Sequence, residues 1–431
     1  MWCRSLLARL VLGVGPVVLG VSACAPPGPV RAALHGTLAD LQQEIAAAAA
    51  AGRLDRAATT ELAEAVLRRE IASARGLDGA SRVRSLRGCA PPLEGALRDR
   101  AEGEDAVAAE ALLVLLASGR VGPEPFVERY ANAMDAPFRA VAARAAVEDR
   151  DVLFRRAAFV DGDRRVRLAA FEAALAAPDP GDLEAALEAA RLDPDPVIQS
   201  LAARLAGKIG GESAVLGLRD RYAAMDTPGR LAIIEAWSQP AAFRTGGERE
   251  LVSVAEGGAG LLSVAAVDAL ARRGRVTEAH IGVLSRSIAH GTRGERRLAI
   301  AVAPLGDGRV VTALQRAARD PSPELRVPAL RRLLERPETR KRAHEQLRAL
   351  GAGRSAVAAE ARSVLAAIGD RSVVPALARD ITAADAAGRQ LAALDAFALG
   401  ESNIAARALA DAEPRVRTQV ACAIIAARAR D

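Results

Sequence analysis

The sequence predicts an all-α fold, an α-solenoid in which roughly a dozen helical hairpins stack into a superhelix. Hydrophobic residues make up 51% of the chain and aromatic residues only 3%, so alanine and leucine, which favour helices, supply most of the apolar surface. No segment alternates apolar and polar residues as a half-buried strand does. A pattern of turn and helix also recurs about every 31 residues, and such repetition is typical of solenoids.

Residues 1–23 have the layout of a secretory signal peptide. Arg4 and Arg9 supply the positive charge, residues 10–19 form the apolar region, and Ser22 and Ala23 are the small residues expected at a cleavage site. The apolar region is too short to cross a bilayer, because a membrane-spanning helix needs roughly 20 apolar residues. We therefore expect this segment to direct export and to be removed.

Cys24 follows directly and closes the run Val-Ser-Ala-Cys at residues 21–24. This run resembles the lipobox of bacterial lipoprotein precursors. The resemblance implies that the Cys24 thiol carries lipid, that the chain is cut before it, and that the protein is anchored to the periplasmic side of a membrane. Ala25 in the next position implies, by the same resemblance, the outer membrane. The alternative is an ordinary signal peptide with a cysteine there by chance.

Two segments come before the repeats. The proline-rich stretch 24–29 predicts a short, stiff tether that keeps the fold close to the membrane. In residues 30–75, apolar residues recur at helical spacing on both sides of a turn at Gly52, which predicts a helical hairpin. We interpret this hairpin as the cap that the terminal repeat of a solenoid requires. Its apolar positions are Leu34, Leu38, Leu41, Ile45, Leu62, Val66 and Ile71.

Residues 78–431 contain the repeats. Each unit has an acidic turn, an arginine near the start of a helix, and a glycine where that helix should end, because glycine adopts the left-handed conformation without penalty. The clearest of these glycines are Gly210, Gly306, Gly369 and Gly400. In chain order, the aligned arginine position is occupied by Arg84, Ala108, Arg139, Arg167, Gln199, Arg230, Ser263, Arg297, Arg326, Ala358, Arg389 and Arg417.

The acidic turns and helix-ending glycines together resemble HEAT repeats, in the short subtype also found in phycobilisome-lyase-like proteins. In that family, turn aspartates and helix-opening arginines form ladders of ion pairs along the solenoid. The positions without arginine imply a discontinuous ladder in this chain. Carried over to this sequence, the resemblance pairs Asp78 with Arg84, Asp161 with Arg167, Asp320 with Arg326, and Asp411 with Arg417.

Cys89 and Cys422 lie in the first and last repeats. In an extended solenoid, stacking at about 10 Å per helix layer separates them by on the order of 100 Å. We therefore expect two small buried thiols and no disulfide within one molecule, with an intermolecular bridge as the alternative.

Aromatic residues gather between positions 126 and 171. One interpretation is an irregular junction between repeats, filled by larger side chains. The other is an exposed interface, because aromatic side chains often anchor binding partners. The candidate interface residues are Phe126, Tyr130, Phe138, Phe154, Phe159 and Phe171.

The sequence shows no pattern for a catalytic, cofactor or metal site. The four histidines lack the spacing that places two ligands on one helix face, and the glycine-rich stretches do not lead into a phosphate-binding Gly-Lys-Ser/Thr. We therefore expect a non-enzymatic, membrane-tethered HEAT-repeat lipoprotein that acts as a protein-interaction scaffold in the bacterial envelope. By analogy with HEAT proteins, the partner should bind the helices that open at Arg139, Arg167, Gln199 and Arg230, which line the concave face.

Two other functions stay open, together with a purely structural spacer. A lyase-like HEAT protein would handle a prosthetic group, although the sequence shows no reactive cysteine or histidine cluster. A HEAT-fold nucleic-acid binder would fit the formal charge of +6, although export removes it from nucleic acid. The identity of the partner and the oligomeric state stay open as well.

Overall fold

The computed structural model describes residues 28–258, 260–383 and 385–428, and every regular element within these residues is helical. Successive helices pack as pairs, and the second helix of each pair also packs on the second helix of the next. This is the arrangement of a solenoid, in which each repeat contacts its neighbours. The all-α solenoid prediction is confirmed.

The first three helices are α1 (Gly28–His35), α2 (Leu38–Ala50) and α3 (Arg56–Ser73). The predicted hairpin corresponds to α2 and α3, and α1 is an additional helix in front of it. Thr37 and Asp55 begin α2 and α3, because their side chains accept the free backbone N–H groups of Asp40 and Ala58. After α3 come α4 (Gly76–Arg84) and the short helices η1 (Ser85–Cys89) and η2 (Pro91–Leu93).

The rest of the chain consists of helix pairs. The first helices are α5 (Glu94–Ala101), α7 (Glu124–Tyr130), α9 (Val152–Phe159), α11 (Leu183–Leu192), α13 (Glu212–Tyr222), α16 (Glu248–Glu256), α18 (Glu278–His290), α20 (Gly308–Ala317), α22 (Pro337–Gly351), α24 (Val374–Asp380) and α26 (Ser402–Ala405). The second helices are α6 (Ala106–Ala117), α8 (Ala136–Glu148), α10 (Arg164–Ala176), α12 (Pro196–Ile209), α14 (Thr227–Trp237), α17 (Leu261–Ala271), α19 (Arg293–Val302), α21 (Pro323–Leu333), α23 (Ala356–Ala367), α25 (Ala386–Ala398) and α27 (Pro414–Arg428). The short helices η3 (Pro180–Asp182), α15 (Pro240–Ala242), η4 (Phe243–Gly247), η5 (Arg371–Val373) and η6 (Ala406–Ala410) lie between them.

The helix ends follow the local signals in the sequence. Gly210, Gly369 and Gly400 adopt positive φ values of 72°, 79° and 81°, as predicted for residues that end a helix. Gly306 does not adopt a positive φ, so its helix ends in another way. The acidic residue after that glycine, Asp307, accepts the backbone N–H of Arg309 and begins α20.

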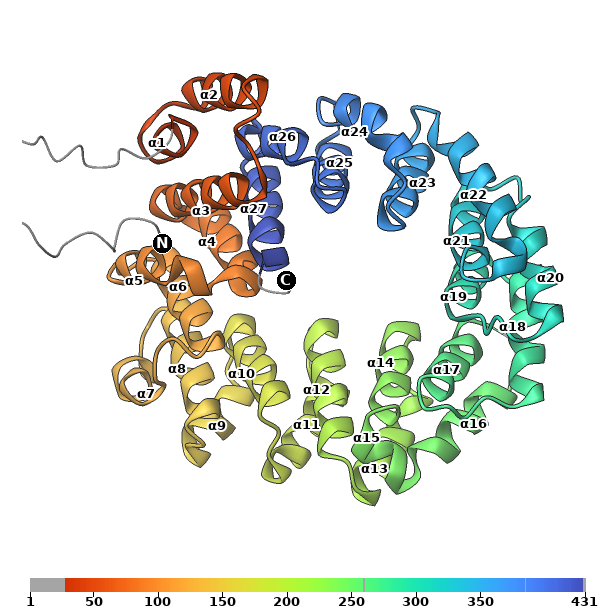
Figure 1. Ribbon diagram of the computed structural model, residues 1–431. Helices are drawn as coiled ribbons and strands as arrows, with labels where there is room; N and C mark the ends of the chain where they lie inside the picture. Colours follow the sequence, from red (N-terminus) through yellow and green to blue (C-terminus); the bar gives the residue numbers. More distant parts are fainter. Residues whose placement is uncertain (1–27, 259, 384, 429–431) are drawn as a thin grey trace, which may run out of the picture.

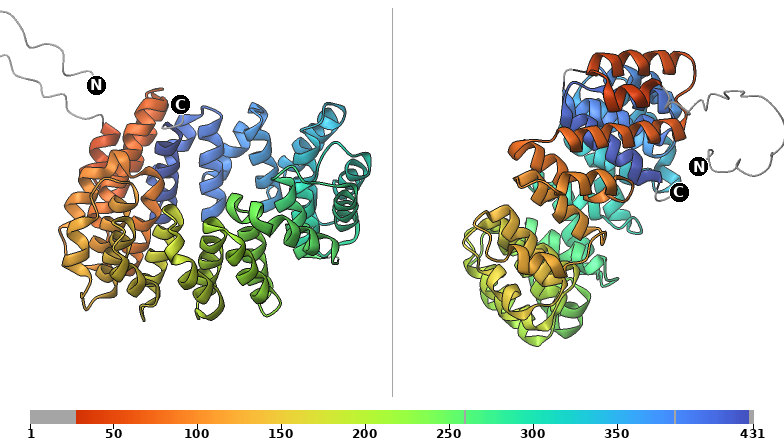
Figure 2. Two further views of the ribbon diagram at one scale, coloured as in Figure 1. Left: turned by 90° about the horizontal axis from the view of Figure 1, so that it is seen from below. Right: turned by 90° about the vertical axis from the view of Figure 1, so that its left-hand side faces the viewer.

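The two ends of the solenoid meet. Figure 1 shows the helices running around a ring in chain order, with the blue C-terminal helices beside the red and orange N-terminal ones, and Figure 2 shows the same contact from two other sides. Helix α27 packs along α3 and η1, and η6 packs on α2. The sequence predicted an extended superhelix whose ends lie far apart, and this part of the prediction is wrong. The N-terminal helices form the surface on which the last repeat docks.

Candidate functional site: the seam of the ring

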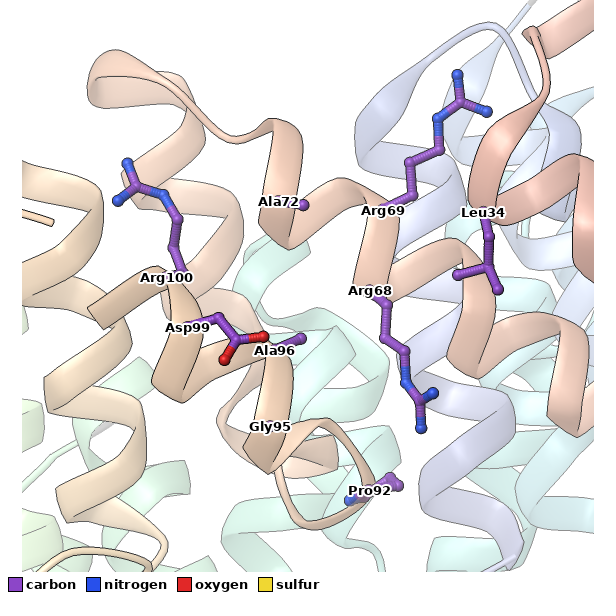
Figure 3. A pocket seen from close by; sticks show the side chains of 9 residues that line it. All are labelled: Leu34, Arg68, Arg69, Ala72, Pro92, Gly95, Ala96, Asp99 and Arg100. Atoms are coloured by element: carbon purple, nitrogen blue, oxygen red, sulfur yellow. The ribbon is translucent and has the colours of Figure 1, made fainter. Parts of the chain in front are cut away.

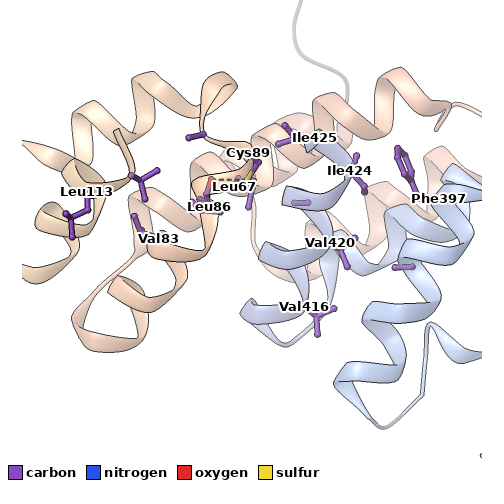
Figure 4. Packing of buried hydrophobic residues seen from close by; sticks show 14 of the residues in the cluster. Leu67, Val83, Leu86, Cys89, Leu113, Phe397, Val416, Val420, Ile424 and Ile425 are labelled. Atoms are coloured by element: carbon purple, nitrogen blue, oxygen red, sulfur yellow. Dashed lines mark hydrogen bonds between the residues drawn. The ribbon is translucent and has the colours of Figure 1, made fainter. Parts of the chain in front are cut away.

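We call the contact between the two chain ends the seam. It consists of α2, α3 and η1 on one side and α26, η6 and α27 on the other, and α4 packs beside α3 and η1. Leu67 and Leu86 pack there with Val420 and Ile424, and all four side chains are fully buried (Figure 4). The hydrophobic core therefore continues across the seam.

A disulfide joins Cys89 of η1 to Cys422 of α27. Their Cα atoms are 5.4 Å apart, within the usual range for a disulfide. The prediction of two distant free thiols is therefore wrong. It counted helix layers along a straight axis, whereas the small rotation between neighbouring repeats accumulates here into a full circle.

Glu70 of α3 is the central polar residue of the seam. Its carboxylate accepts hydrogen bonds from Arg417 of α27, through Nε at 2.9 Å and Nη2 at 2.6 Å, and from Nη1 of Arg82 at 2.7 Å. The side chain of Glu70 is only 7% exposed. The amide of Gln42 also donates to the carbonyl of Ala410 at 3.0 Å, so α2 holds the same end of the chain.

An arginine ladder runs through the repeats, but its ion pairs join different partners from those predicted. Arg167 was expected to pair with Asp161. Its Nε instead donates to Asp193 of the following turn at 2.7 Å, while its Nη1 binds the backbone carbonyl of Asp161 at 2.8 Å. The Asp161 carboxylate in turn pairs with Arg139 of the preceding repeat at 3.2 Å. Each of these arginines therefore links the backbone of its own turn to the aspartate in the turn of the next repeat.

The same arrangement recurs further along. Arg389 pairs with Asp411 at 2.6 Å, and Arg417 binds the carbonyl of Asp411 rather than its carboxylate. Each ladder aspartate also accepts the backbone N–H two residues ahead, as Asp411 does from Glu413. The turn aspartate thus shapes its own turn and receives the arginine of the repeat before it.

The predicted pair Asp78 and Arg84 is also wrong. Arg84 lies at the C-terminal end of α4, not near its start, and pairs with Glu110 of α6. Asp78 instead lies 3.3 Å from Nε of Arg82. Because α4 begins at Gly76, the arginine position of the alignment falls one turn too far along this helix.

The predicted pair Asp320 and Arg326 is wrong for a different reason. Asp320 pairs with Arg296 of α19 at 2.5 Å, so Arg296 and not its neighbour Arg297 occupies the ladder position. The turn that follows α22 has no aspartate to receive Arg326. The buried Nε of Arg326 accordingly has no hydrogen-bond partner.

Three of the ladder aspartates, Asp161, Asp320 and Asp411, have lowered pKa values and are ionised at neutral pH. Burial acts to raise the pKa of Asp161, but hydrogen bonds from Arg139 and from the Asp163 N–H outweigh it and lower that pKa. For Asp320, the backbone N–H of Ser322 is the largest cause of a lowered pKa, with Arg296 adding to it. The turns therefore keep their negative charges for the arginines that they bind.

The aromatic residues are mainly core. Phe138, Phe159 and Phe171 are buried, and the rings of Phe159 and Phe171 lie 4.6 Å apart. Phe126 and Tyr130 are half-buried and stack on each other. Of the six candidate interface residues, only Phe154 is exposed, at 40%.

Large apolar side chains are nevertheless exposed in the same part of the chain. Among the described residues, most of the exposed large hydrophobic side chains lie between positions 134 and 197, and the others are Leu77 and Ile368. We call this set the apolar segment 134–197. It consists of Met134, Val152, Leu153, Phe154, Val160, Leu192 and Val197.

A groove of about 690 Å³ lies beside the seam, between α3 and α5. Figure 3 shows Arg68 pointing towards Pro92, whereas Arg69 and Arg100 point upwards in this view, away from Pro92. Arg100 is engaged by Asp105 at 2.5 Å. A second cavity of about 190 Å³ lies at the seam itself and includes Glu70.

The predictions about the lipid anchor, metal sites and membrane-spanning helices can be compared with only part of the chain. Cys24 and the whole of residues 1–27 lie outside the described residues. Within the residues that are described, no group of histidine, cysteine and acidic side chains is placed to hold a metal ion. No helix in the described ranges is long and apolar enough to cross a membrane.

Sequence reasoning missed two buried carboxylates that accept hydrogen bonds from arginines, Glu70 and Asp193. Asp193 lies in the acidic turn six residues before Gln199, so pairing each arginine with the turn of the following repeat would have identified it. Glu70 follows no repeat pattern. No protein-family model matches the chain, and no curated protein matches it, so membership of the HEAT family stays a prediction from the motifs.

Proposed function

We propose that this protein is an exported, lipid-anchored ring that acts as a non-enzymatic protein-interaction scaffold in a bacterial envelope. The disulfide between Cys89 and Cys422 supports export most directly, because disulfides persist in oxidising compartments and are rare in the cytosol. This support is independent of the signal-peptide pattern, since the two cysteines lie far from the leader. The lipobox at residues 21–24 supports the anchor.

The apolar segment 134–197 supports the scaffold role. Large exposed apolar side chains that gather in one part of a folded protein typically mark an interaction surface. Leu153 and Phe154 belong to the first helix α9, whereas Val197 belongs to the second helix α12. We therefore extend the proposed interface from the second helices alone to both helices of these repeats.

Charge pairing favours a protein partner over nucleic acid. A nucleic-acid surface needs a row of cations free to contact phosphates. On α10, Glu172 pairs with Arg87 at 2.5 Å, and on α14, Glu235 pairs with Arg272 at 2.6 Å. Carboxylates thus interrupt the arginines along the second helices.

The anchor is tested by Cys24→Ser in the native host. We expect an unprocessed precursor that no longer partitions with detergent-extracted lipoproteins, because lipid transfer to the thiol precedes cleavage. Cys3→Ser is the matched control, since it removes a thiol from the leader, and it should be processed normally. A Cys24→Ser protein that is still cut after Ala23 and still membrane-bound would refute the anchor.

The interface is tested by capture of envelope proteins after cross-linking. Leu153→Ser combined with Val160→Ser should abolish capture of a partner that the unchanged protein retains. Ile368→Ser is the control, because Ile368 is similarly exposed but lies outside the apolar segment 134–197. Equal capture by both variants would contradict this placement, and no capture by the unchanged protein would favour the spacer alternative.

A further inference from the structure

The seam holds more arginine than carboxylate, unlike the ladder steps at Arg139, Arg167 and Arg389. At an ordinary step, one arginine meets one aspartate, as Arg167 meets Asp193. At the seam, the single carboxylate of Glu70 forms ion pairs with both Arg82 and Arg417. A third arginine, Arg69, lines the same cavity and forms no ion pair or hydrogen bond with any described residue.

The charged groups that make up this imbalance are largely buried. The side chains of Arg82 and Arg417 are 18% and 13% exposed, and Glu70 is the only carboxylate among the residues that line the cavity. Asp78 lies near Arg82 but is 83% exposed, so water screens its charge. Burying guanidinium groups without matching negative charge costs free energy, which a bound anion would offset.

We propose that the seam cavity binds a phosphate group. Its volume of about 190 Å³ corresponds to roughly six water molecules, enough for one tetrahedral oxyanion with some water. Guanidinium groups present paired N–H donors that match phosphate oxygens, and they remain charged at all physiological pH values. The buried Nε of Arg82 lies 3.3 Å from the exposed carboxylate of Asp78 but makes no hydrogen bond.

A phosphate at this place would join the two ends of the chain. Arg69 belongs to α3, Arg82 to α4 and Arg417 to α27. An anion shared by these three side chains therefore adds a non-covalent bridge across the seam, next to the disulfide.

The phosphate has two chemical sources, a free ion or a phospholipid headgroup. Arg69 also lines the open groove between α3 and α5, so the cavity adjoins a surface wide enough for a headgroup (Figure 3). Three residues separate Cys24 from Gly28, where α1 begins, so the four steps between these two positions span at most about 14 Å. The lipid source rests on the proposed anchor, whereas the binding of phosphate does not.

The test uses the mature chain with Cys24→Ser, which is free of lipid, and isothermal titration with sodium phosphate at constant ionic strength. We expect one site per chain. Arg69→Gln should weaken phosphate binding roughly tenfold or more, because it removes the guanidinium that has no protein partner. Arg53→Gln is the control, since Arg53 is exposed in the turn between α2 and α3, and it should bind as the unchanged chain does.

A second measurement follows the seam itself. In protein with Cys89→Ser and Cys422→Ser, phosphate should raise the unfolding temperature more in the Arg53→Gln background than in the Arg69→Gln background, because ligand binding stabilises only the competent site. General salting effects act equally on both. Equal shifts in both backgrounds, or no bound phosphate at about 10 mM, would overturn the proposal.

Vesicles separate the two sources. If phosphatidylglycerol vesicles displace bound phosphate from the unchanged site and not from Arg69→Gln, a headgroup is the natural ligand. If only the inorganic ion binds, the site serves free phosphate. Neither result depends on whether Cys24 is lipidated in the cell, so a failure here is distinct from a failure of the anchor.

Discussion

The seam and the ladder step between α10 and α12 use the same chemistry over very different sequence distances. At both, an arginine near the start of a second helix binds the carbonyl of its own turn and a buried carboxylate opposite: Arg167 binds Asp193, 26 residues away, and Arg417 binds Glu70, 347 residues away. The last repeat therefore finds, at the beginning of the chain, the acceptor that a following repeat would have supplied. The ring closes because the arginine of the last repeat has a buried carboxylate partner, as the arginine of an internal repeat does.

The two regions differ in what holds them besides the arginine. Neighbouring repeats are joined by a short stretch of chain, so their contact is maintained by connectivity. The seam has no such link, and the disulfide between Cys89 and Cys422 takes its place. Changes at the seam should therefore alter the shape of the molecule, whereas equivalent changes inside the ladder should alter stability alone.

The largest expected effect is that of Glu70→Ala. It leaves Arg82 and Arg417 without their carboxylate and should cost about 3–5 kcal/mol of unfolding free energy, as the loss of one partner from a buried ion pair does. Asp193→Ala should cost a similar amount. After reduction of the disulfide, small-angle scattering should show expansion of the Glu70→Ala ring and not of the Asp193→Ala ring. Equal expansion of both would remove the distinction between seam and ladder.

Removal of the disulfide comes next. Cys422→Ser together with Cys89→Ser should lower stability by about 2–4 kcal/mol in urea denaturation, because the bond restricts the unfolded chain. The ring should stay closed at neutral pH, since Glu70 and the apolar contacts remain. Limited proteolysis of α27 checks this, and rapid cleavage there in the native buffer would show that the disulfide alone closes the ring.

Asp395 on α25 provides a carboxylate outside the ladder for comparison. Burial raises its pKa to about 6, against the smaller opposing effects of the Ser363 hydroxyl and Arg362. Because this value lies above that of the unfolded chain, the folded state takes up a proton as pH falls through 6, so stability should rise between pH 7 and pH 4 from this group. Asp395→Asn should remove that dependence and stabilise the protein by about 2 kcal/mol at pH 7. Thermal unfolding across pH measures it, and an unchanged profile would contradict the assignment.

The smallest expected effect distinguishes two arginines that the sequence treats alike. Arg296→Ala should cost about 1.5 kcal/mol, since it removes the hydrogen bonds to Asp320 and to the carbonyl of Ile288. Arg326→Ala should change the unfolding free energy by no more than about 0.5 kcal/mol, because no carboxylate receives it. A loss at Arg326 that matched the loss at Arg296 would restore the pairing predicted from the repeat alignment.

The sequence by itself determined the helices, their turns and their repetition. Helix propensity, side-chain caps such as Asp55 and Asp307, and helix-ending glycines such as Gly369 act within a few residues, so they can be recognised without knowing what packs where. The same local reasoning identified the ladder arginines Arg139, Arg167 and Arg389, because each lies one turn into its helix.

Only the tertiary structure decided which groups these residues meet. Each ladder arginine reaches the turn of the next repeat, a relation set by how hairpins stack and not by spacing within one hairpin. Closure of the ring depends on a small rotation added at every repeat, and no single motif specifies that angle. Glu70, Cys89 and Cys422 became partners for this reason, since a chain whose curvature had summed to less than a full circle would have left all three apart.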